Sequence, residues 1–179
     1  MIDLRLGDWR AVLADVGEVD HLISDPPYSA TTHEGARTSK AGHVGARKSS
    51  SSRSGGHVPA REIAYEAITP DAVKEFVDAW APRVRGWMAI MTDDILAQAW
   101  RQEMARHGRF AFPTVAILQP RPRLTGDGPG AWMVSLMVSR PRTRAMSKWG
   151  SLPGAYSSRA QPGIVMGSKP LSQMREIVT

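Results

Sequence analysis

Four consecutive residues, Asp25, Pro26, Pro27 and Tyr28, have the side chains and the stiffness needed to hold a flat substrate that carries an amino group. Proline has a fixed φ and no backbone N–H, so two in succession forbid a helix and leave backbone carbonyl groups as acceptors. The Asp25 carboxylate and the Pro26 carbonyl can accept the two hydrogens of an exocyclic amino group, while the Tyr28 ring stacks on the planar group. The same residues also suit an ordinary Asp-Pro-Pro turn capped by a buried tyrosine.

The segments before this tetrapeptide predict how it is positioned. The short apolar run 19–23 predicts a strand that ends at Asp25. Residues 9–15 are compatible with a helix, and Asp8 is suited to cap its N-terminus. The acidic turn is therefore expected at the carboxyl end of a strand that follows a short capped helix.

Composition limits the class of protein. The 179 residues, 42% of them hydrophobic, suffice for one globular domain, and the absence of cysteine excludes disulfides and thiolate metal sites and fits a cytoplasmic location. No apolar run approaches the ~20 residues that span a bilayer, and the N-terminus does not have the pattern of a signal peptide. The formal net charge of +6 favours a polyanionic partner.

A basic segment rich in serine and glycine, residues 29–61, follows the tetrapeptide directly. It has too little apolar surface to order itself, so we expect a flexible loop. Such a loop can close over phosphate groups, and a solvated charge run is the alternative. Its histidines, His33, His43 and His57, lack the spacing of metal ligands, and we predict no metal site. Its cations are Arg37, Lys40, Arg47, Lys48, Arg53 and Arg61, against the single acid Glu34.

The rest of the chain has a regular α/β pattern. Two helices are expected, preceded by the capping segments Thr69-Pro70-Asp71 and Thr92-Asp93-Asp94. The strands after the second helix are joined by a loop rich in turn residues. Such neighbouring strands predict an antiparallel pair at the edge of an otherwise parallel sheet, and Pro113 indicates an edge or a bulge. The expected helices are 72–81 and 95–107, the strands 85–91, 110–119 and 132–139, and the loop 120–130.

Asp25-Pro26-Pro27-Tyr28 resembles the catalytic motif of the DNA amino-methyltransferases, which transfer a methyl group from S-adenosylmethionine (AdoMet) to adenine or cytosine. The resemblance implies a partial Rossmann-like methyltransferase sheet, mostly parallel with an antiparallel edge hairpin. It implies that Asp25 and Pro26 hold the amino group, that Asp25 also lies at the cofactor, and that Tyr28 stacks on a base flipped out of the duplex. It further implies that Asp8, in a Gly-Asp pair at this spacing, contacts the AdoMet adenine.

A second short motif is Lys169-Pro170, ahead of the helical pattern 171–178. It resembles the Lys-Pro signature that precedes the AdoMet-binding strand in methyltransferases with the permuted order, catalytic half first. The resemblance implies that Lys169 approaches the carboxylate of the cofactor. The family pattern has histidine and threonine ahead of the lysine, whereas Met166, Gly167 and Ser168 stand here.

The family usually recognises DNA between these two motifs, and the resemblance therefore makes residues 140–168 a candidate recognition loop. Residues 149–156 within it, with glycine, proline and aromatic residues, suit a groove or base stacking. A solvated arginine-rich loop is the alternative for the cations alone. The DNA-binding candidates here are Arg142, Arg144 and Lys148, beside Arg37, Lys40, Arg47, Lys48 and Arg53 of the first loop.

The glycine-rich turn with which the family cradles AdoMet, between a strand and a helix, has no counterpart in this sequence. We therefore expect residues 1–179 to be the catalytic and DNA-facing part of a methyltransferase, binding AdoMet weakly by itself. A truncated product, a second chain or dimer mate that supplies the cofactor half, and an inactive DNA-binding relic are the alternatives. In the family that this motif resembles, aspartate before Pro-Pro is more typical of adenine enzymes and serine of cytosine ones, so the resemblance implies adenine-N6 rather than cytosine-N4 as the methylated atom.

Overall fold

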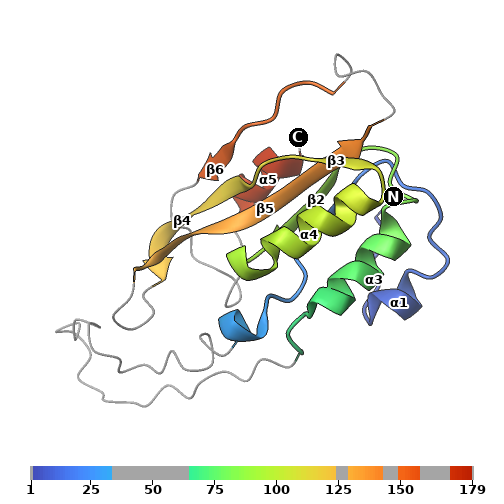
Figure 1. The fold of residues 1–179 in the computed structure, drawn as a ribbon, viewed down its shortest axis with the longest axis horizontal. Coiled ribbons are helices and arrows are strands. Elements are labelled where there is room, and N and C mark those ends of the chain that lie inside the picture. The colour runs from blue at the N-terminus through green and yellow to red at the C-terminus, as the bar shows by residue number, and fades with distance from the viewer. Residues whose placement is uncertain (1, 34–64, 124–128, 143–148, 158–169, 179) are drawn as a thin grey trace.

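The computed structural model describes residues 2–33, 65–123, 129–142, 149–157 and 170–178. They form a six-stranded sheet with helices packed against it (Figure 1). In chain order the elements are α1 (Trp9–Val12), β1 (Leu22–Ser24), α3 (Pro70–Trp80), β2 (Met88–Thr92), α4 (Asp94–Arg106), β3 (Arg109–Ala111), β4 (Val115–Arg123), β5 (Ala131–Pro141), β6 (Ala155–Ser157) and α5 (Leu171–Val178).

The sheet is mostly parallel, and β5 is the reversed strand among those described. The order is β1-β2-β5-β4-β6, and β3 also pairs with β5. β1 runs parallel to β2, and β6 runs parallel to β4, while β5 is antiparallel to β2, β3 and β4. All the described strands except β5 therefore point the same way. The expected α/β class with a mostly parallel sheet is confirmed.

The hairpin of β4 and β5 lies inside the described sheet rather than at its edge, where we expected it. β2 pairs along one side of β5, and β6 adds a parallel strand outside β4. The sequence around β6 is rich in glycine and proline and predicted only a loop, so this strand was missed. The expected strand 110–119 is interrupted near Pro113, as that residue indicated, and β4 continues to Arg123 into the expected loop.

Two helices, α3 and α4, cover one face of the sheet (Figure 1). The Thr69 hydroxyl caps α3, Pro70 occupies its first position, and Asp93 caps α4. Gly108 follows α4 with a φ of +70°, a left-handed conformation that glycine adopts without strain. Both helices were predicted. Their buried side chains, Val73, Phe76, Val77, Trp80, Leu96, Trp100 and Met104, pack against Met88, Ile90 and Met137 of the sheet.

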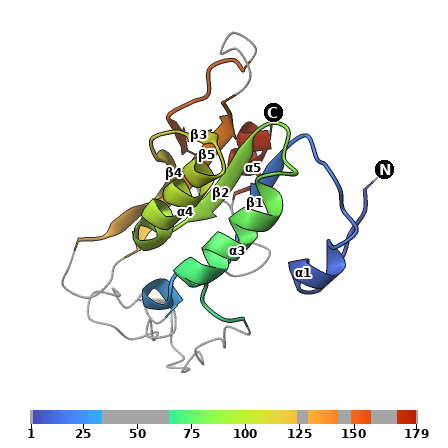
Figure 2. The same ribbon diagram turned by 45° about the vertical axis from the view of Figure 1, so that its right-hand side comes forward.

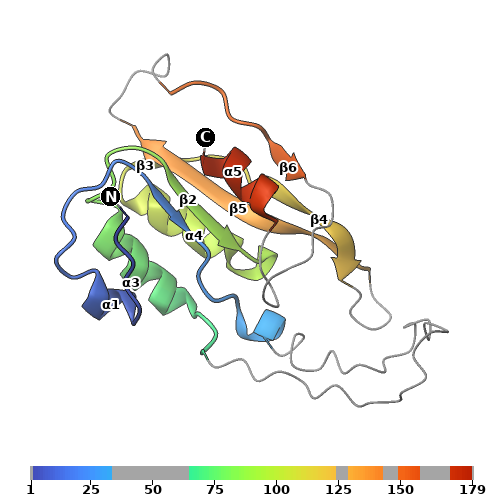
Figure 3. The ribbon, with the colours of Figure 1, turned by 180° about the vertical axis from the view of Figure 1, so that it is seen from behind.

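The opposite face of the sheet is partly covered by α5, which has the predicted bounds (Figure 3). Met174 and Ile177 pack on the second core, whose strand residues include Met91 and Leu136. Buried Gln173 joins β4 to β6, because its side-chain amide donates to the Leu118 and Tyr156 carbonyls at 3.2 Å and 3.0 Å. No helix in the described ranges is long and apolar enough to cross a membrane.

The short helix α1 lies beside α3, away from the sheet (Figure 2). The Trp9 ring meets the Phe76 ring edge to face, with 5.1 Å between the centroids. The helix was predicted over residues 9–15 but ends at Val12. Because it has no buried residue of its own, this packing and its ion pairs hold it in place.

A close approach of two backbones positions β1. Gly86, just before β2, faces the turn before β1 so closely that a Cβ atom there would lie 2.5 Å from the Asp20 carbonyl oxygen. The His21 imidazole Nδ1 accepts a hydrogen bond of 2.9 Å from the backbone N–H of Trp87. Val19 also bridges to Val84. These contacts set the register that places the end of β1 beside the end of β2.

Candidate active site

Two aspartates follow neighbouring parallel strands at the same edge of the sheet. Asp25 comes directly after β1, and Asp93 directly after β2. β1 and β2 pair with Ser24 opposite Ile90, so their carboxyl ends meet at one edge. The carboxyl ends of such strands are where open α/β sheets bind ligands. This edge is the candidate active site.

Within the tetrapeptide, Tyr28 and Asp25 are joined. The Tyr28 hydroxyl donates a hydrogen bond of 3.0 Å to Oδ1 of Asp25. The Asp25 residue is exposed, and Pro26, Pro27 and Tyr28 are half-buried. The Tyr28 ring packs against the second core, and its carbonyl accepts a hydrogen bond of 3.1 Å from the Ile68 N–H. The tyrosine therefore supports the carboxylate from the protein side, and the carboxylate remains at the surface.

The Asp93 carboxylate fastens the segment that follows this tetrapeptide. Its Oδ2 accepts hydrogen bonds from the Ser29 N–H at 2.9 Å and the Thr32 hydroxyl at 2.7 Å, and its Oδ1 accepts from the Leu96 N–H at 3.1 Å. Burial acts to raise the pKa of Asp93, but these hydrogen bonds outweigh it and hold the pKa below its ordinary value. The ionised carboxylate thus ties the turn after β1 to the N-terminus of α4.

Sequence reasoning missed this part of the site. Asp93 was predicted only as a helix cap, and Ser29 and Thr32 were placed in a flexible loop. The structure instead has residues 30–33 in a helical turn, with Ser29 and His33 buried. One signal in the sequence was available: Asp93 comes directly after a strand and stands next to a second acid. Because parallel strands end at the same edge of a sheet, a residue that follows one strand can lie near a residue that follows its neighbour.

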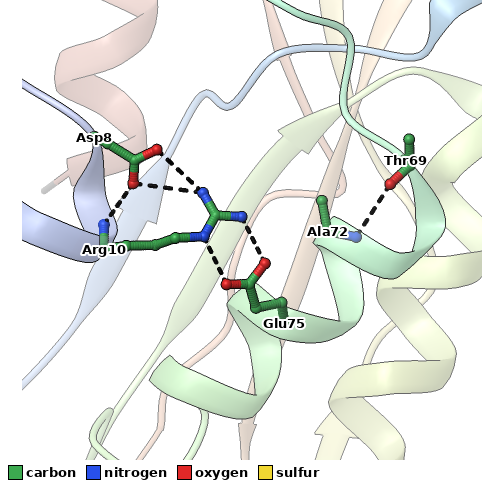
Figure 4. Close-up of polar contacts among 5 residues, drawn as sticks. All are labelled: Asp8, Arg10, Thr69, Ala72 and Glu75. Atoms are coloured by element: carbon green, nitrogen blue, oxygen red, sulfur yellow. Dashed lines mark hydrogen bonds and ion pairs between the residues drawn. The ribbon is translucent and has the colours of Figure 1, made fainter.

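Asp8 is the N-cap of α1, as predicted, and is paired with a neighbouring arginine (Figure 4). Its Oδ1 accepts a hydrogen bond of 2.8 Å from the Arg10 N–H, and its Oδ2 lies 3.2 Å from Arg10 Nη1. Arg10 also makes two bonds of 2.6 Å to Glu75 of α3. The hydrogen bonds with Glu75 raise the pKa of Arg10 and lower the pKa of Glu75.

Most of the predicted cation sites lie outside the described residues. Arg142 is described and exposed, with its guanidinium over the Phe110 ring at 5.6 Å. Because β5 is reversed and its Ser139 pairs with Met88, Arg142 lies at the amino end of β2, opposite the edge with Asp25. The structure does not bring these two residues together. The candidates outside the described ranges are Arg37, Lys40, Arg47, Lys48, Arg53, Arg144, Lys148 and Lys169.

A further feature at the Asp25 edge is the projecting hairpin. The last pair between β2 and β5 joins Thr92 to Ser135, and β5 begins four residues earlier, at Ala131. The part of the hairpin beyond Ser135 therefore extends past the carboxyl end of β2, on the side of Asp25 and Asp93. It carries Trp132, which is 58% exposed. This overhang was not predicted, because it depends on the register between strands that are distant in the sequence.

Comparison with known proteins identifies the fold. No protein-family model and no curated protein sequence matches this chain. The crystal structure of the M1.HpyAVI–SAM complex matches it with a TM-score of 0.52 and 13% sequence identity, over 94% of this chain and 68% of that chain. The crystal structure of M1.HpyAVI matches with a TM-score of 0.52 and 15% identity, over 99% and 74%. This chain therefore has the fold of M1.HpyAVI.

Proposed function

We propose that this chain is the catalytic part of a DNA amino-methyltransferase, which transfers a methyl group from AdoMet to N6 of an adenine flipped out of the duplex. The hydrogen bond between Tyr28 and Asp25, at the edge where β1 and β2 end, is the observation that carries the proposal. Similarity of the fold to a methyltransferase solved with SAM supports it, and so does the net charge of +6.

The chemistry of the exposed carboxylate explains how these residues act. An exocyclic amine is a poor nucleophile while its lone pair is delocalised into the base. When Asp25 and the Pro26 carbonyl accept its two hydrogens, the nitrogen is drawn towards a tetrahedral state and its lone pair becomes available for attack. Pro27 keeps the turn rigid, and the Tyr28 hydroxyl holds Asp25 in place. The Tyr28 ring stacks on the flipped base.

AdoMet, when bound, supplies the electrophilic methyl group. We propose Asp8, Asp25 and Lys169 as the residues of this chain that contact it. Asp25 is exposed at the strand edge and fits such a contact. The Asp8 oxygens already accept bonds from the Arg10 N–H and its guanidinium, so Asp8 contacts the cofactor only if Arg10 yields part of that pairing. The described residues therefore offer a partial cofactor site.

DNA contacts form the second part of the proposal. We assign them to the cations of the two basic segments: Arg37, Lys40, Arg47, Lys48, Arg53, Arg142, Arg144 and Lys148. The projecting hairpin with Trp132 lies on the side of Asp25, where an exposed ring can reach a nucleic acid next to the active site. Phosphate contacts of this kind weaken with salt, so DNA binding should fall as ionic strength rises.

A second chain, or a dimer mate, is proposed to complete the cofactor half. Among the described strands β1 is an edge strand, paired only with β2, and its Ile23 is 39% exposed. Ile2, Leu4 and Leu6 alternate with Asp3 and Arg5 in the manner of a strand, yet they are 86%, 90% and 101% exposed. Unpaired edges and exposed apolar alternation favour pairing with added strands. Sedimentation at several concentrations measures this association.

The proposal is tested by methyl transfer from radiolabelled AdoMet to DNA, with the partner chain present where one is found. Asp25→Ala should abolish transfer and leave DNA binding unchanged, because the carboxylate acts on the amine. Asp71→Ala, at an exposed acid in the first turn of α3, is the matched control and should retain activity. Normal transfer by Asp25→Ala would show that the catalytic assignment is wrong.

Two alternatives are separated by the same assay. Digestion of the product and chromatography of its nucleosides distinguish N6-methyladenine from the N4-methylcytosine of the alternative enzyme. DNA binding without any transfer, in the presence of the cofactor and partner chain, would favour an inactive DNA-binding fragment of the same fold. The aspartate before Pro26-Pro27 is the feature that favours adenine.

A further inference from the structure

A cavity of about 410 Å³ lies near the amino end of β2, away from Asp25. Trp87 forms one wall and precedes β2, whereas Asp93 follows that strand, six residues or roughly 20 Å further along. The break between β3 and β4 and the segment 149–154 form the other walls. The cavity is therefore separate from the candidate active site, and its volume falls in the range of about 300–1,000 Å³ typical of ligand pockets.

The walls are largely aromatic. The Trp87 ring contacts Trp149 edge to face, with 5.2 Å between centroids, and lies 5.9 Å from Phe112. All three residues line the cavity, together with Val115 and Leu152. Aromatic rings present flat apolar faces, on which a planar ring of a ligand packs well. The shape of the lining therefore favours a planar aromatic group.

The cavity also contains one buried cation. Arg140, only 5% exposed, lines it, and its guanidinium lies 5.7 Å from the ring centroids of both Phe112 and Trp149. Nη1 donates a hydrogen bond of 3.1 Å to the Pro141 carbonyl. Within the described residues Arg140 has no carboxylate partner, and no acid lines the cavity. A buried cation without a counter-ion favours an anionic ligand group.

We infer that this cavity binds a nucleotide, with the base between the aromatic walls and the phosphate at Arg140. A purely apolar ligand would leave the guanidinium unneutralised, and a cationic ligand would be repelled by it. Ser151 adds a hydroxyl group at the lining that can bond to the polar edge of a base. The nucleotide is either free or an unpaired residue of a nucleic acid strand.

Calorimetric titration of the full chain with AMP and with adenosine tests the phosphate contact. AMP should bind, and adenosine should bind at least ten times more weakly because it has no group for Arg140. Arg140→Gln should reduce the affinity for AMP to that for adenosine, provided its circular dichroism matches that of the parent chain. Equal affinities of the parent chain for AMP and adenosine, or no binding of AMP, would overturn the inference.

A second variant locates the binding site without altering a buried residue. Leu152 lines the cavity and is 47% exposed, so Leu152→Asp adds a repelling charge at little cost to folding. It should weaken AMP binding at least tenfold. Leu171→Asp, at an exposed position of α5 outside the cavity, is the matched control and should bind AMP normally. AMP binding that is unchanged by Leu152→Asp, or lost when AdoMet is added, would place AMP elsewhere and overturn the inference.

The source of the nucleotide is resolved by a third titration with a short oligoadenylate. If the oligomer binds and Leu152→Asp weakens it, the cavity takes a residue of a strand; if only AMP responds to the variant, it takes the free nucleotide. Either result supports a cavity that binds the base at its aromatic walls and the phosphate at Arg140. The inference does not depend on methyl transfer, because the titrations do not involve Asp25, and it can fail or hold independently of the proposed function.

Discussion

Tyr28 donates a hydrogen bond of 3.0 Å to Oδ1 of Asp25, so an aromatic residue of the motif orients its acid three positions earlier. The ring is anchored in the second core, whereas the carboxylate is exposed at the end of β1. We propose two separate tasks for the tyrosine. Its ring stacks on a base, and its hydroxyl orients the carboxylate that accepts the amino group.

The variant Tyr28→Phe separates these two tasks. It removes the hydroxyl and keeps the ring, so the carboxylate loses one hydrogen bond worth about 0.5–1.5 kcal/mol. We expect the methylation rate of bound substrate to fall about 2- to 10-fold, with DNA affinity unchanged. Tyr28→Ala, which also removes the ring, should lower the rate further. Single-turnover methylation assays measure both rates, and an undiminished rate for Tyr28→Phe would show that the hydroxyl has no part in orienting Asp25.

Asp93→Ala should destabilise the protein more than a typical helix-cap substitution. It removes the cap of α4, worth about 0.5–2 kcal/mol, and leaves the buried N–H of Ser29 without its acceptor, which costs about 1–3 kcal/mol. We expect the free energy of unfolding to fall by about 2–4 kcal/mol in urea titrations. Asp94→Ala, at the neighbouring exposed acid, is the control and should cost about 0.5 kcal/mol. Equal losses for both variants would show that the hydrogen bonds from Ser29 and Thr32 to Asp93 do not stabilise the fold.

The lowered pKa of Asp93 predicts how stability depends on pH. A carboxyl whose pKa in the folded protein is below its ordinary 3.8 stabilises the fold above pH 3.8, and this contribution is lost as the pH falls through the folded pKa. Asp93→Asn cannot titrate, so it serves as the reference. We expect the difference in unfolding free energy between the parent chain and this variant to be largest near pH 6 and to shrink towards pH 3. A constant difference would show that the carboxylate charge is not what holds Ser29 and Thr32.

The sequence predicted local features around the candidate site better than distant contacts. The strand that ends before Asp25 and the caps Asp8, Thr69 and Asp93 were predicted because their signals are local: prolines end the strand, and a capping side chain acts within one turn. The hydrogen bond from the Ser29 N–H to Asp93 joins residues 64 positions apart. Its formation depends on which strands are neighbours, and this was not evident from either segment alone.

The same distinction holds for the sheet. α5 was predicted with its bounds because its apolar residues recur at helical spacing after a proline. β6 was missed because a three-residue strand owes its existence to pairing with β4 rather than to its own composition. The position of Arg142 opposite Asp25 follows from the reversed direction of β5, which sequence patterns placed in a hairpin without fixing its neighbours.

Gly86→Ala tests whether the register of β1 controls the site. The new Cβ atom would lie 2.5 Å from the Asp20 carbonyl oxygen, which is closer than van der Waals contact permits, so β1 must shift against β2. We expect a loss of about 1–3 kcal/mol in unfolding free energy and a larger fractional loss of methylation, because Asp25 moves with its strand. Gly17→Ala is the matched control, since nothing lies within 4 Å of its Cβ position. A Gly86→Ala variant with normal stability and normal methylation would show that the close approach does not position Asp25.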